Sequence, residues 1–144
     1  MQKRKSDTQG FEASMIKVVF DTNVLVSYLI NGNGTPARAA SLFFDGKIDV
    51  FYSNNIYEEY EEVLNREHFH FDKTKISKIL DDLATYGKLI NPEASFFPIP
   101  DETDRIFYDT AKQSESFLVT GNTRHYPQEA FILTPAKFLE RNAV

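Results

Sequence analysis

The sequence predicts a three-layer α/β/α sandwich with a mainly parallel central sheet. Residues 16–20 are mostly β-branched or aromatic, as a strand buried on both faces requires. Four further short apolar segments follow, and stretches with apolar residues at helical spacing separate most of them. Strands that alternate with helices pair in parallel through crossover connections, and the helices then cover both faces of the sheet.

Capping and turn residues set the elements of the first half. Asp21 precedes a helix over 24–30, which stops at the Asn-Gly turn 31–34. Thr35 and Pro36, a cap and a proline at the first helical position, open a helix that ends near Phe44. After a strand over 48–52, Ser53 or Asn54 caps a third helix, because apolar residues recur at helical spacing up to Leu64.

The second half begins with a connection over 66–74, in which His68 and His70 alternate with two phenylalanines. This alternation could hold a metal in a strand, but a loop pinned by its phenylalanines is the simpler interpretation. A helix over 75–86 ends at Gly87, and a short strand over 88–91 follows. Asp101 begins the next helix, after which we expect strands over 116–120 and 131–133 and a closing helix over 135–141.

Length and composition predict one domain. The chain has 144 residues, enough to bury a sizeable core, and no cysteine, which excludes disulfides and thiolate metal sites. The formal charge of −5 opposes binding of nucleic acid by bulk electrostatics, although acids gathered around a metal would account for much of that excess. No apolar run approaches the roughly 18 residues of a membrane span, and no signal-peptide core is present. We therefore expect a soluble cytoplasmic protein without a membrane partner.

The folded domain is expected at 15–144, preceded by a flexible N-terminal tail over 1–14. The tail is polar and carries Lys3, Arg4 and Lys5, and Met15 stands directly before the first strand. These cations could touch RNA phosphates, but a solvated tail is the simpler interpretation.

Polar side chains follow two of the expected strands. Asp21, Thr22 and Asn23 come directly after residues 16–20, and Asn122 comes shortly after residues 116–120. The carboxyl ends of parallel strands share one edge of the sheet, which is where ligands bind in such folds. We therefore take Asp21 as the centre of a candidate site, although the same three residues also form an ordinary helix N-cap.

Further acids reach the same edge from the helices that begin there. The third helix carries glutamates at 58, 59, 61 and 62, and a helical wheel places Glu59 at the border of its apolar stripe. Four glutamates usually form a solvated face, so this geometry favours Glu59 only weakly. Asp101 and Asp104 fit an N-cap and an acid of the first helical turn, roles that require no function.

Three carboxylates in one crevice repel one another unless a cation joins them. A hard divalent ion such as Mg²⁺ or Mn²⁺ binds through oxygen ligands and water, and it polarises phosphoryl oxygens and activates water for attack. Hydrolysis of a phosphodiester is the chemistry that this site predicts.

Four blocks of the chain resemble, in order, those of a PIN domain. They are VVFDTNVLVS at 18–27, SNNIYEEYEEVLNR at 53–66, DETD at 101–104 and FLVTGN at 117–122. The resemblance runs from residue 15 to about residue 137, and it is greatest to the PIN domains described as toxins of toxin–antitoxin systems. It implies a metal-dependent endoribonuclease with a PIN-like, flavodoxin-like sandwich, often a homodimer, that a small antitoxin protein inhibits.

The resemblance also assigns residues. Asp21, Glu59 and Asp104 match the catalytic acids that hold the metal, and Asp101 is a less certain neighbour of Asp104. Thr120 and Asn122 match a block that reads Thr-Gly-Asp in many members, so Asn122 stands in place of an acid. An amide adds no negative charge, and a second cation would therefore be held less well.

The mechanism that follows is in-line attack by an activated water on an RNA phosphodiester. Asp21 and Asp104 would ligate Mg²⁺ or Mn²⁺, and Glu59 would hold the ion through water or help to deprotonate the nucleophile. Thr22 and Asn23 would orient Asp21 or a bound water. Candidate phosphate contacts are Arg105, Arg124 and His125. Single-stranded RNA, or the unpaired part of a structured RNA, is favoured over duplex because its backbone and splayed bases can enter a crevice.

Two alternatives remain open at this point. A phosphatase of the haloacid dehalogenase type also places an aspartate at a strand end, but it would need an acid where Asn23 stands and a Gly-Asp pair where the chain has Gly121 and Asn122. The second alternative is a non-catalytic PIN-like module with weak metal affinity that binds RNA or a protein partner. Asn122 and the acidic charge support it.

Overall fold

The computed structural model describes residues 15–142, so the predicted tail over 1–14 and the last two residues of the predicted domain lie outside the described residues. Five parallel strands form one sheet in the order β3-β2-β1-β4-β5, which confirms the predicted parallel sheet. The strands are β1 (Lys17–Phe20), β2 (Asp49–Tyr52), β3 (Lys88–Leu89), β4 (Phe117–Val119) and β5 (Ile132–Leu133).

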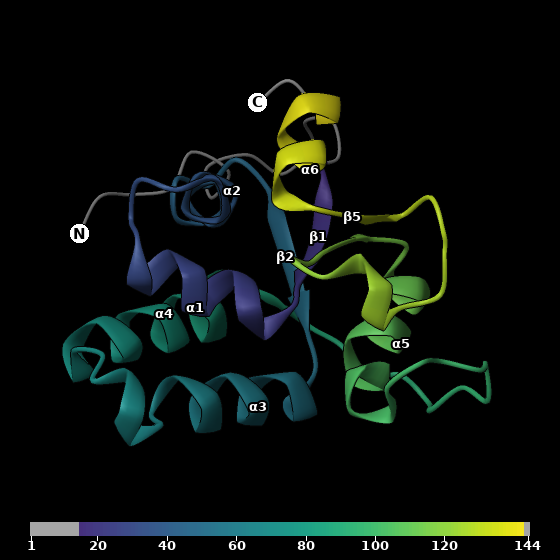
Figure 1. Ribbon diagram of the computed structural model, residues 1–144, viewed down its shortest axis with the longest axis horizontal. Helices are drawn as coiled ribbons and strands as arrows, with labels where there is room; N and C mark the ends of the chain where they lie inside the picture. Colours follow the sequence, from purple (N-terminus) through teal and green to yellow (C-terminus); the bar gives the residue numbers. More distant parts are fainter. Residues whose placement is uncertain (1–14, 143–144) are drawn as a thin grey trace.

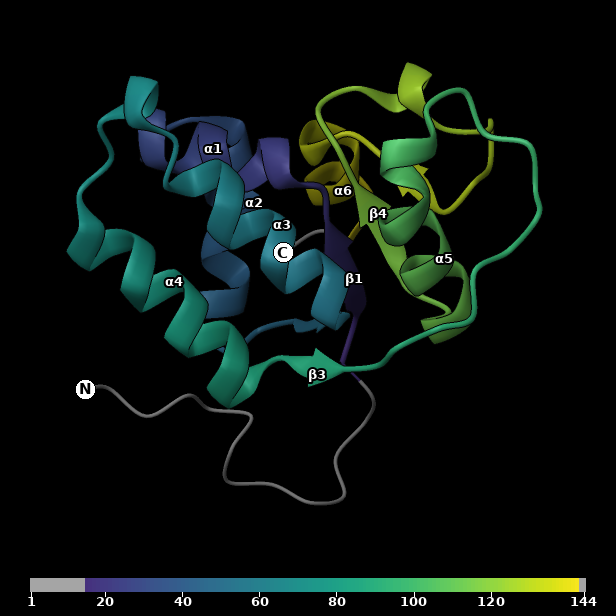
Figure 2. The same ribbon diagram turned by 90° about the horizontal axis from the view of Figure 1, so that it is seen from below.

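Six α-helices cover the two faces of this sheet, which completes the three-layer sandwich (Figures 1 and 2). On one face of the sheet, α5 packs against β1, β2 and β4. On the other face, α1 contacts β1 and α4 contacts β2. Helix α2 packs against both α1 and α6. The helices are α1 (Thr22–Ile30), α2 (Thr35–Phe44), α3 (Asn54–Leu64), α4 (Lys73–Tyr86), α5 (Arg105–Ser114) and α6 (Pro135–Asn142). No helix within residues 15–142 is long and apolar enough to cross a membrane.

The strand order places a topological switch between β1 and β4. The chain moves outward from β1 to β2 and β3, then returns across the opposite face through α5 to β4. Right-handed crossovers in opposite directions put their helices on opposite faces, and the carboxyl ends of the two strands where they diverge leave a crevice. Helices α1, α3 and α5 all begin at this carboxyl end of the sheet, the lower end in Figure 1.

Burial explains why β1 occupies the centre. Val18, Val19 and Phe20 are at most 2 % exposed, so both faces of this strand are covered. The buried hydroxyl of Tyr60, on α3, donates a hydrogen bond to the main-chain oxygen of Phe20 and ties α3 to the end of the strand. The start of α1 and the middle of α3 are thereby held near one another.

The predicted boundaries hold to within a few residues, with one revision. Asp101 does not begin an α-helix, because its carboxylate accepts hydrogen bonds from both the main-chain N–H and the hydroxyl of Thr103 and closes a tighter turn. This turn is the 3₁₀ helix η3 (Glu102–Asp104), and α5 starts one residue later. Two other 3₁₀ turns are η2 (Glu67–Phe69) and η4 (Thr123–His125).

The histidine-rich connection is a loop, as expected. His68 lies within η2, and His70 has the left-handed backbone conformation with φ 55°, so the two histidines do not alternate along a strand. The rings of Phe69 and Phe71 stack with their centroids 4.8 Å apart.

Candidate functional site

Asp21 lies at the carboxyl end of β1 and is 7 % exposed. One carboxylate oxygen, Oδ1, accepts the main-chain N–H of Asn23 at 3.2 Å, so Asp21 does cap α1. The other, Oδ2, accepts the hydroxyls of Thr120 at 3.0 Å and Tyr126 at 2.7 Å. Each carboxylate oxygen has two lone pairs, which leaves Oδ1 with one lone pair for a further ligand. Capping and ligation are therefore compatible in this residue.

The hydroxyl of Thr120 connects both strand ends. It donates to Asp21 and accepts from the side-chain amide of Asn23 at 3.3 Å and from the main-chain N–H of Asn122 at 3.1 Å. One donor and two acceptor positions are all that a hydroxyl offers, so this group is fully used. The oxygen of the Asn23 side chain accepts the N–H of Gly121 at 3.0 Å. Asn23 thus joins the loop after β4 to the start of α1.

Glu59 reaches the site from α3. The hydroxyl of Thr22 donates to its Oε2 at 3.3 Å, so Thr22 contacts Glu59 in addition to lying beside Asp21 in sequence. Burial raises the pKa of Glu59, repulsion from Asp21 raises it further, and the hydrogen bond from Thr22 opposes both effects. The hydrogen bond from Thr22, the residue after Asp21, thereby joins Glu59 to the start of α1.

Asp104, at the start of α5, completes the group of acids. It makes no side-chain capping bond, and its Oδ2 is buried without a hydrogen-bond partner. The pKa of this carboxyl is raised to about 6. Burial is the largest cause, and repulsion from the charges of Asp21 and Asp101 raises the pKa further. His125 lies 3.5 Å from Oδ2 through Nδ1, within ion-pair range but outside hydrogen-bond geometry. Asp104 is an acid of the first turn of η3, as predicted, and that role leaves its buried Oδ2 without a hydrogen-bond donor.

These carboxylates fit a divalent cation. A buried anionic oxygen with no donor is costly unless a positive charge lies beside it, and the neighbouring acids make that cost larger. Oxygen ligands of this kind suit Mg²⁺ and Mn²⁺. Among the described residues, one ligand atom from each of Asp101, Asp104 and His125 lies within 4.8 Å of the other two.

The predicted phosphate contacts lie in different surroundings. Arg105 donates to both carboxylate oxygens of Glu102 and to the main-chain and side-chain oxygens of Ser95, so its guanidinium is engaged within the protein. Arg124 is exposed and lines a pocket of about 650 Å³ together with Tyr126 and Lys137. Arg124 is thus the better placed of the two arginines to meet a phosphate.

Tyr126 is the residue of the site that sequence reasoning missed. It is 4 % exposed, and burial together with the nearby charge of Asp21 raises the pKa of its hydroxyl far above the ordinary value, so it remains a hydrogen-bond donor. A tyrosine four residues after Asn122 carries no signal that distinguishes it from a core aromatic. Only its contact with Asp21 reveals its role.

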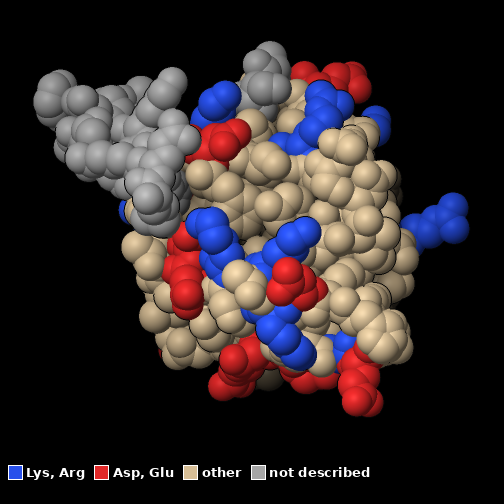
Figure 3. Space-filling view, turned by 90° about the vertical axis from the view of Figure 1, so that its left-hand side faces the viewer, with Lys and Arg blue, Asp and Glu red and all other residues tan. Residues whose placement is uncertain are grey.

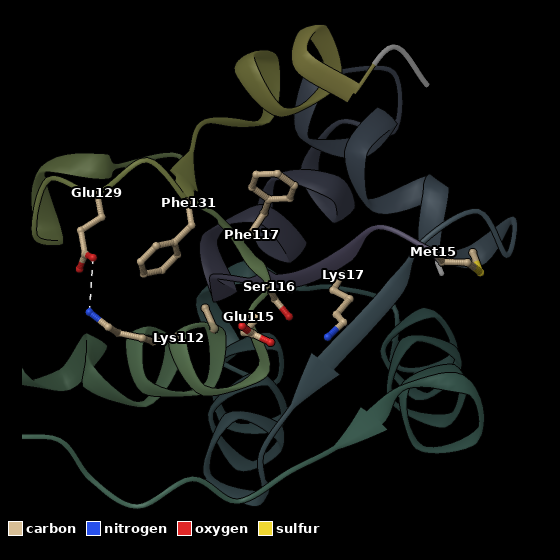
Figure 4. Close-up of a pocket in the computed structure, with 9 residues that line it drawn as sticks. Met15, Lys17, Lys112, Glu115, Ser116, Phe117, Glu129 and Phe131 are labelled. Carbon is tan, nitrogen blue, oxygen red and sulfur yellow. Dashed lines mark hydrogen bonds and ion pairs between the residues drawn. The ribbon is translucent and has the colours of Figure 1, made fainter. Parts of the chain in front are cut away.

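A second pocket, of about 560 Å³, lies at the amino ends of β1 and β4, away from Asp21 (Figure 4). Its cations are held within the protein, because Lys17 donates to the main-chain oxygen of Ser114 at 3.0 Å and Lys112 lies 3.4 Å from Glu129. Ligand sites of parallel sheets lie at the opposite, carboxyl end. We therefore do not include this pocket in the candidate site.

Lys and Arg side chains gather near the middle of the face in Figure 3, with Asp and Glu side chains beside and below them. This face is the left-hand side of Figure 1, toward which the connection from α3 to α4 points. Arg66 pairs with Glu62 at 2.7 Å on α3, and Lys78 pairs with Asp82 at 2.9 Å on α4. These cations are partly neutralised by their partners.

Comparisons with known proteins identify similar chains. The family model described as PIN domain matches residues 17–124. The uncharacterized protein MJ1680 of Methanocaldococcus jannaschii is 35 % identical over 117 residues, which cover 79 % of this chain and 76 % of that protein. The crystal structure of PAE2754 from Pyrobaculum aerophilum is a more distant match, with 16 % identity and a TM-score of 0.49 over 89 % of this chain and 90 % of that chain.

Proposed function

Because this chain belongs to the PIN domain family, we propose that it is a metal-dependent endoribonuclease that hydrolyses phosphodiester bonds of RNA. Family membership indicates a nuclease-type function and a divalent metal. The observation that carries the finer proposal is the buried, unpartnered Oδ2 of Asp104 beside Asp21 and Glu59. A site that gathers three carboxylates without a cation among its side chains is suited to bind one.

Each acid has a role in this proposal. Asp21 and Asp104 would hold Mg²⁺ or Mn²⁺, and a bound cation of this kind polarises a phosphoryl oxygen and makes water more acidic. Glu59, whose pKa is raised mainly by burial, accepts a proton from the attacking water. The water oxygen forms a bond to phosphorus in line with the P–O bond that breaks, and the leaving oxygen takes a proton from solvent. Thr22 orients Glu59 through its hydroxyl.

The proposed substrate is single-stranded RNA or the unpaired part of a structured RNA. Arg124 and Lys137 line the pocket that includes Tyr126, which donates to Asp21. These two cations would attract RNA phosphates to this pocket despite the net charge of −5. A single strand can enter a pocket of this size with its bases unpaired, which a duplex cannot.

Cleavage of a mixed pool of single-stranded RNA tests the proposal. We expect cleavage with Mn²⁺ or Mg²⁺, none with chelator, and at least a 100-fold loss in Asp21→Asn. Glu59→Gln is expected to lose activity, whereas Glu58→Gln, a change at an exposed neighbour on the same helix, keeps it. Equal rates in the Glu59 and Glu58 variants would refute the role given to Glu59. Cleavage that survives in Asp21→Asn would indicate a contaminating nuclease.

We further propose that the protein is a cytoplasmic toxin that forms a homodimer and that a small antitoxin protein inhibits. The support is its sequence resemblance to the toxin group of PIN domains. Induced expression of the wild type is expected to arrest growth of a bacterial host, while Asp21→Asn permits growth. Normal growth with a nuclease that is active in vitro would favour a role in RNA processing instead.

A non-catalytic module that binds RNA or a protein partner is the second candidate. The side-chain amide of Asn122 occupies the position of an acid in related sequences, and it contacts His125 at 2.9 Å. RNA binding that is indifferent to chelator, together with no calorimetric signal for Mn²⁺ or Mg²⁺, would favour this module over the nuclease.

A further inference from the structure

His125 faces the acids of the site. Its Nδ1 is 3.5 Å from Oδ2 of Asp104, and one ligand atom from each of Asp101, Asp104 and His125 lies within 4.8 Å of the other two. Ligands on opposite sides of one cation are roughly 4–4.6 Å apart, since each bond is about 2.0–2.3 Å long. Small side-chain rotations would therefore bring these three groups onto a common ion.

Asp101 is free to take part because its hydrogen bonds use one oxygen. Both the N–H and the hydroxyl of Thr103 donate to Oδ1, at 3.0 and 2.7 Å. This leaves Oδ2 of Asp101 without a bond from Thr103. Asp104 offers its buried, unpartnered Oδ2 on the other side.

The far side of the imidazole ring contacts Asn122. The side-chain nitrogen of Asn122 is 2.9 Å from Nε2 of His125, and the oxygen and nitrogen of an amide exchange places when the group is turned over. With the oxygen toward the ring, Nε2–H donates to Asn122 and the lone pair of Nδ1 faces Asp104. A histidine that ligates a metal generally donates its other N–H to such an acceptor.

Asn122 is itself held in place. Its main-chain N–H donates at 3.1 Å to the hydroxyl of Thr120, which donates to Asp21. The residue that replaces an acid thus belongs to the hydrogen-bond network of Asp21 and also touches His125. It can fix the ring of His125 relative to the acids.

We propose that His125 supplies a nitrogen ligand to the divalent cation and that Asn122 is the positioning residue that sets its tautomer. The proposal rests on the cation site of the proposed function and not on the hydrolysis itself. Imidazole binds first-row transition ions more readily than it binds Mg²⁺, which prefers oxygen. The site therefore favours a transition ion such as Mn²⁺ over Mg²⁺.

Pulsed electron paramagnetic resonance of Mn²⁺ bound to the purified protein, without RNA, tests this ligand directly. We expect modulation of the spin echo by a directly bound ¹⁴N nucleus in the wild type and none in His125→Gln. Calorimetry is expected to show about a tenfold weaker Mn²⁺ affinity in His125→Gln, and little change for Mg²⁺. His68→Gln, at an exposed histidine of η2, is the matched control and keeps the nitrogen signal.

The ¹⁴N coupling of bound Mn²⁺ in variants of Asn122 tests the positioning role of this residue. Asn122→Ala removes the acceptor for Nε2–H, so the ¹⁴N coupling is expected to weaken or shift. Asn122→Asp restores an acceptor, and the coupling returns. A purely structural role for Asn122 would change stability in both variants without changing the nitrogen signal.

Three results would overturn the proposal: no Mn²⁺ binding, bound Mn²⁺ without a nitrogen signal, and a nitrogen signal that survives in His125→Gln. RNA cleavage by a protein that lacks the signal would leave the nuclease standing and make His125 a phosphate contact. The signal without RNA cleavage would leave the ligand assignment standing and refute the nuclease. Failure of the two proposals is therefore distinguishable.

Discussion

Three donors hold the carboxylate of Asp21, and they come from opposite ends of the domain. The N–H of Asn23 lies two residues away, whereas the hydroxyls of Thr120 and Tyr126 lie 99 and 105 residues away in sequence. Because each buried hydrogen bond restricts the orientation of the carboxylate, together they hold Asp21 in place and leave one lone pair of Oδ1 unused. Residues that touch no substrate can thereby control the metal site.

Tyr126→Phe tests this control by removing a single oxygen. Oδ2 of Asp21 would lose one of its two partners in a buried site, so we expect a loss of about 1–2 kcal/mol in the free energy of unfolding. Metal affinity should fall by about 10-fold, in the range for outer partners of metal ligands. Urea denaturation and calorimetry measure the two effects. Tyr57→Phe, at a half-buried tyrosine of α3, is the control, and equal effects in both variants would contradict the prediction.

Asp104 differs from Asp21, because its burial in the folded protein disfavours the negative charge of its carboxylate. Its pKa of about 6 in the folded protein exceeds the ordinary 3.8, so the folded state binds the proton more readily than the unfolded chain. Its contribution to stability therefore falls as the pH rises from 3.8 to 6 and stays unfavourable above pH 6. This unfavourable effect of the Asp104 charge on stability belongs to the metal-free protein, and a bound cation would offset it.

Asp104→Asn should therefore stabilise the metal-free protein at pH 8 by about 1 kcal/mol, a value that allows for solvent screening at a partly exposed site. The difference in the free energy of unfolding between this variant and the wild type should shrink toward zero as the pH falls to 4. Urea denaturation in chelator across this pH range measures it. Asp101→Asn is the control, since hydrogen bonds from Thr103 lower the pKa of Asp101 and its removal should not stabilise the protein. A pH-independent effect in Asp104→Asn would refute the argument.

At the scale of elements, a buried acid fastens the long connection before η3 to α5. Asp109 is 4 % exposed, and its two oxygens accept the N–H and the hydroxyl of Ser95 at 2.9 and 2.6 Å. Arg105 donates to the main-chain oxygen of Ser95 at 3.0 Å. The connection that delivers Asp101 and Asp104 to the site is therefore attached to the helix that follows it.

Asp109→Ala should release this attachment. The N–H of Ser95 would lose its partner, and we expect a loss of about 1–3 kcal/mol in the free energy of unfolding. Hydrogen exchange over residues 91–100 should quicken more than in the strands. Asp81→Ala, at an exposed acid of α4, provides the comparison. Unchanged exchange in this segment of the Asp109 variant would show that other contacts hold the connection.

At the scale of the whole molecule, a cation bound at the proposed site would couple metal binding to folding. The cation would bind the folded protein and not the unfolded chain, so Mn²⁺ at 100 times its dissociation constant should stabilise the fold by about 2.7 kcal/mol. Thermal unfolding should shift upward with Mn²⁺ and return with chelator. Asp21→Asn should show no shift. An equal shift in that variant would mean that Mn²⁺ binds elsewhere.

The architecture could be predicted from the sequence because its signals are local. The apolar run before Asp21 and the turn residues that bound each helix depend on near neighbours, and the parallel sheet follows from their alternation. Asp21 and Asn122 could be placed at one sheet edge for the same reason. Glu59 could be chosen among its neighbours only by family resemblance, since its position on the helical wheel was ambiguous.

The hydrogen bonds of the site could not be predicted, because they join distant segments. Tyr126, which directly follows η4, lies 105 residues from Asp21 along the chain. The attachment of Arg105 to Ser95 and Glu102 likewise depends on the path of the connection before η3. Asp104 fitted an acid of a first helical turn in the sequence, and only the structure shows that its Oδ2 is buried without a hydrogen-bond partner.

The spread of the site from Asp21 to Tyr126 also orders events during synthesis. A ribosome exposes β1, α3 and η3 before β4 and η4, so the early chain carries all three acids without the two hydroxyls that hold Asp21. It also lacks β4, one of the two neighbours of the central strand. A chain still being translated therefore lacks the two hydroxyl donors to Asp21 until the segment that follows β4 has been made.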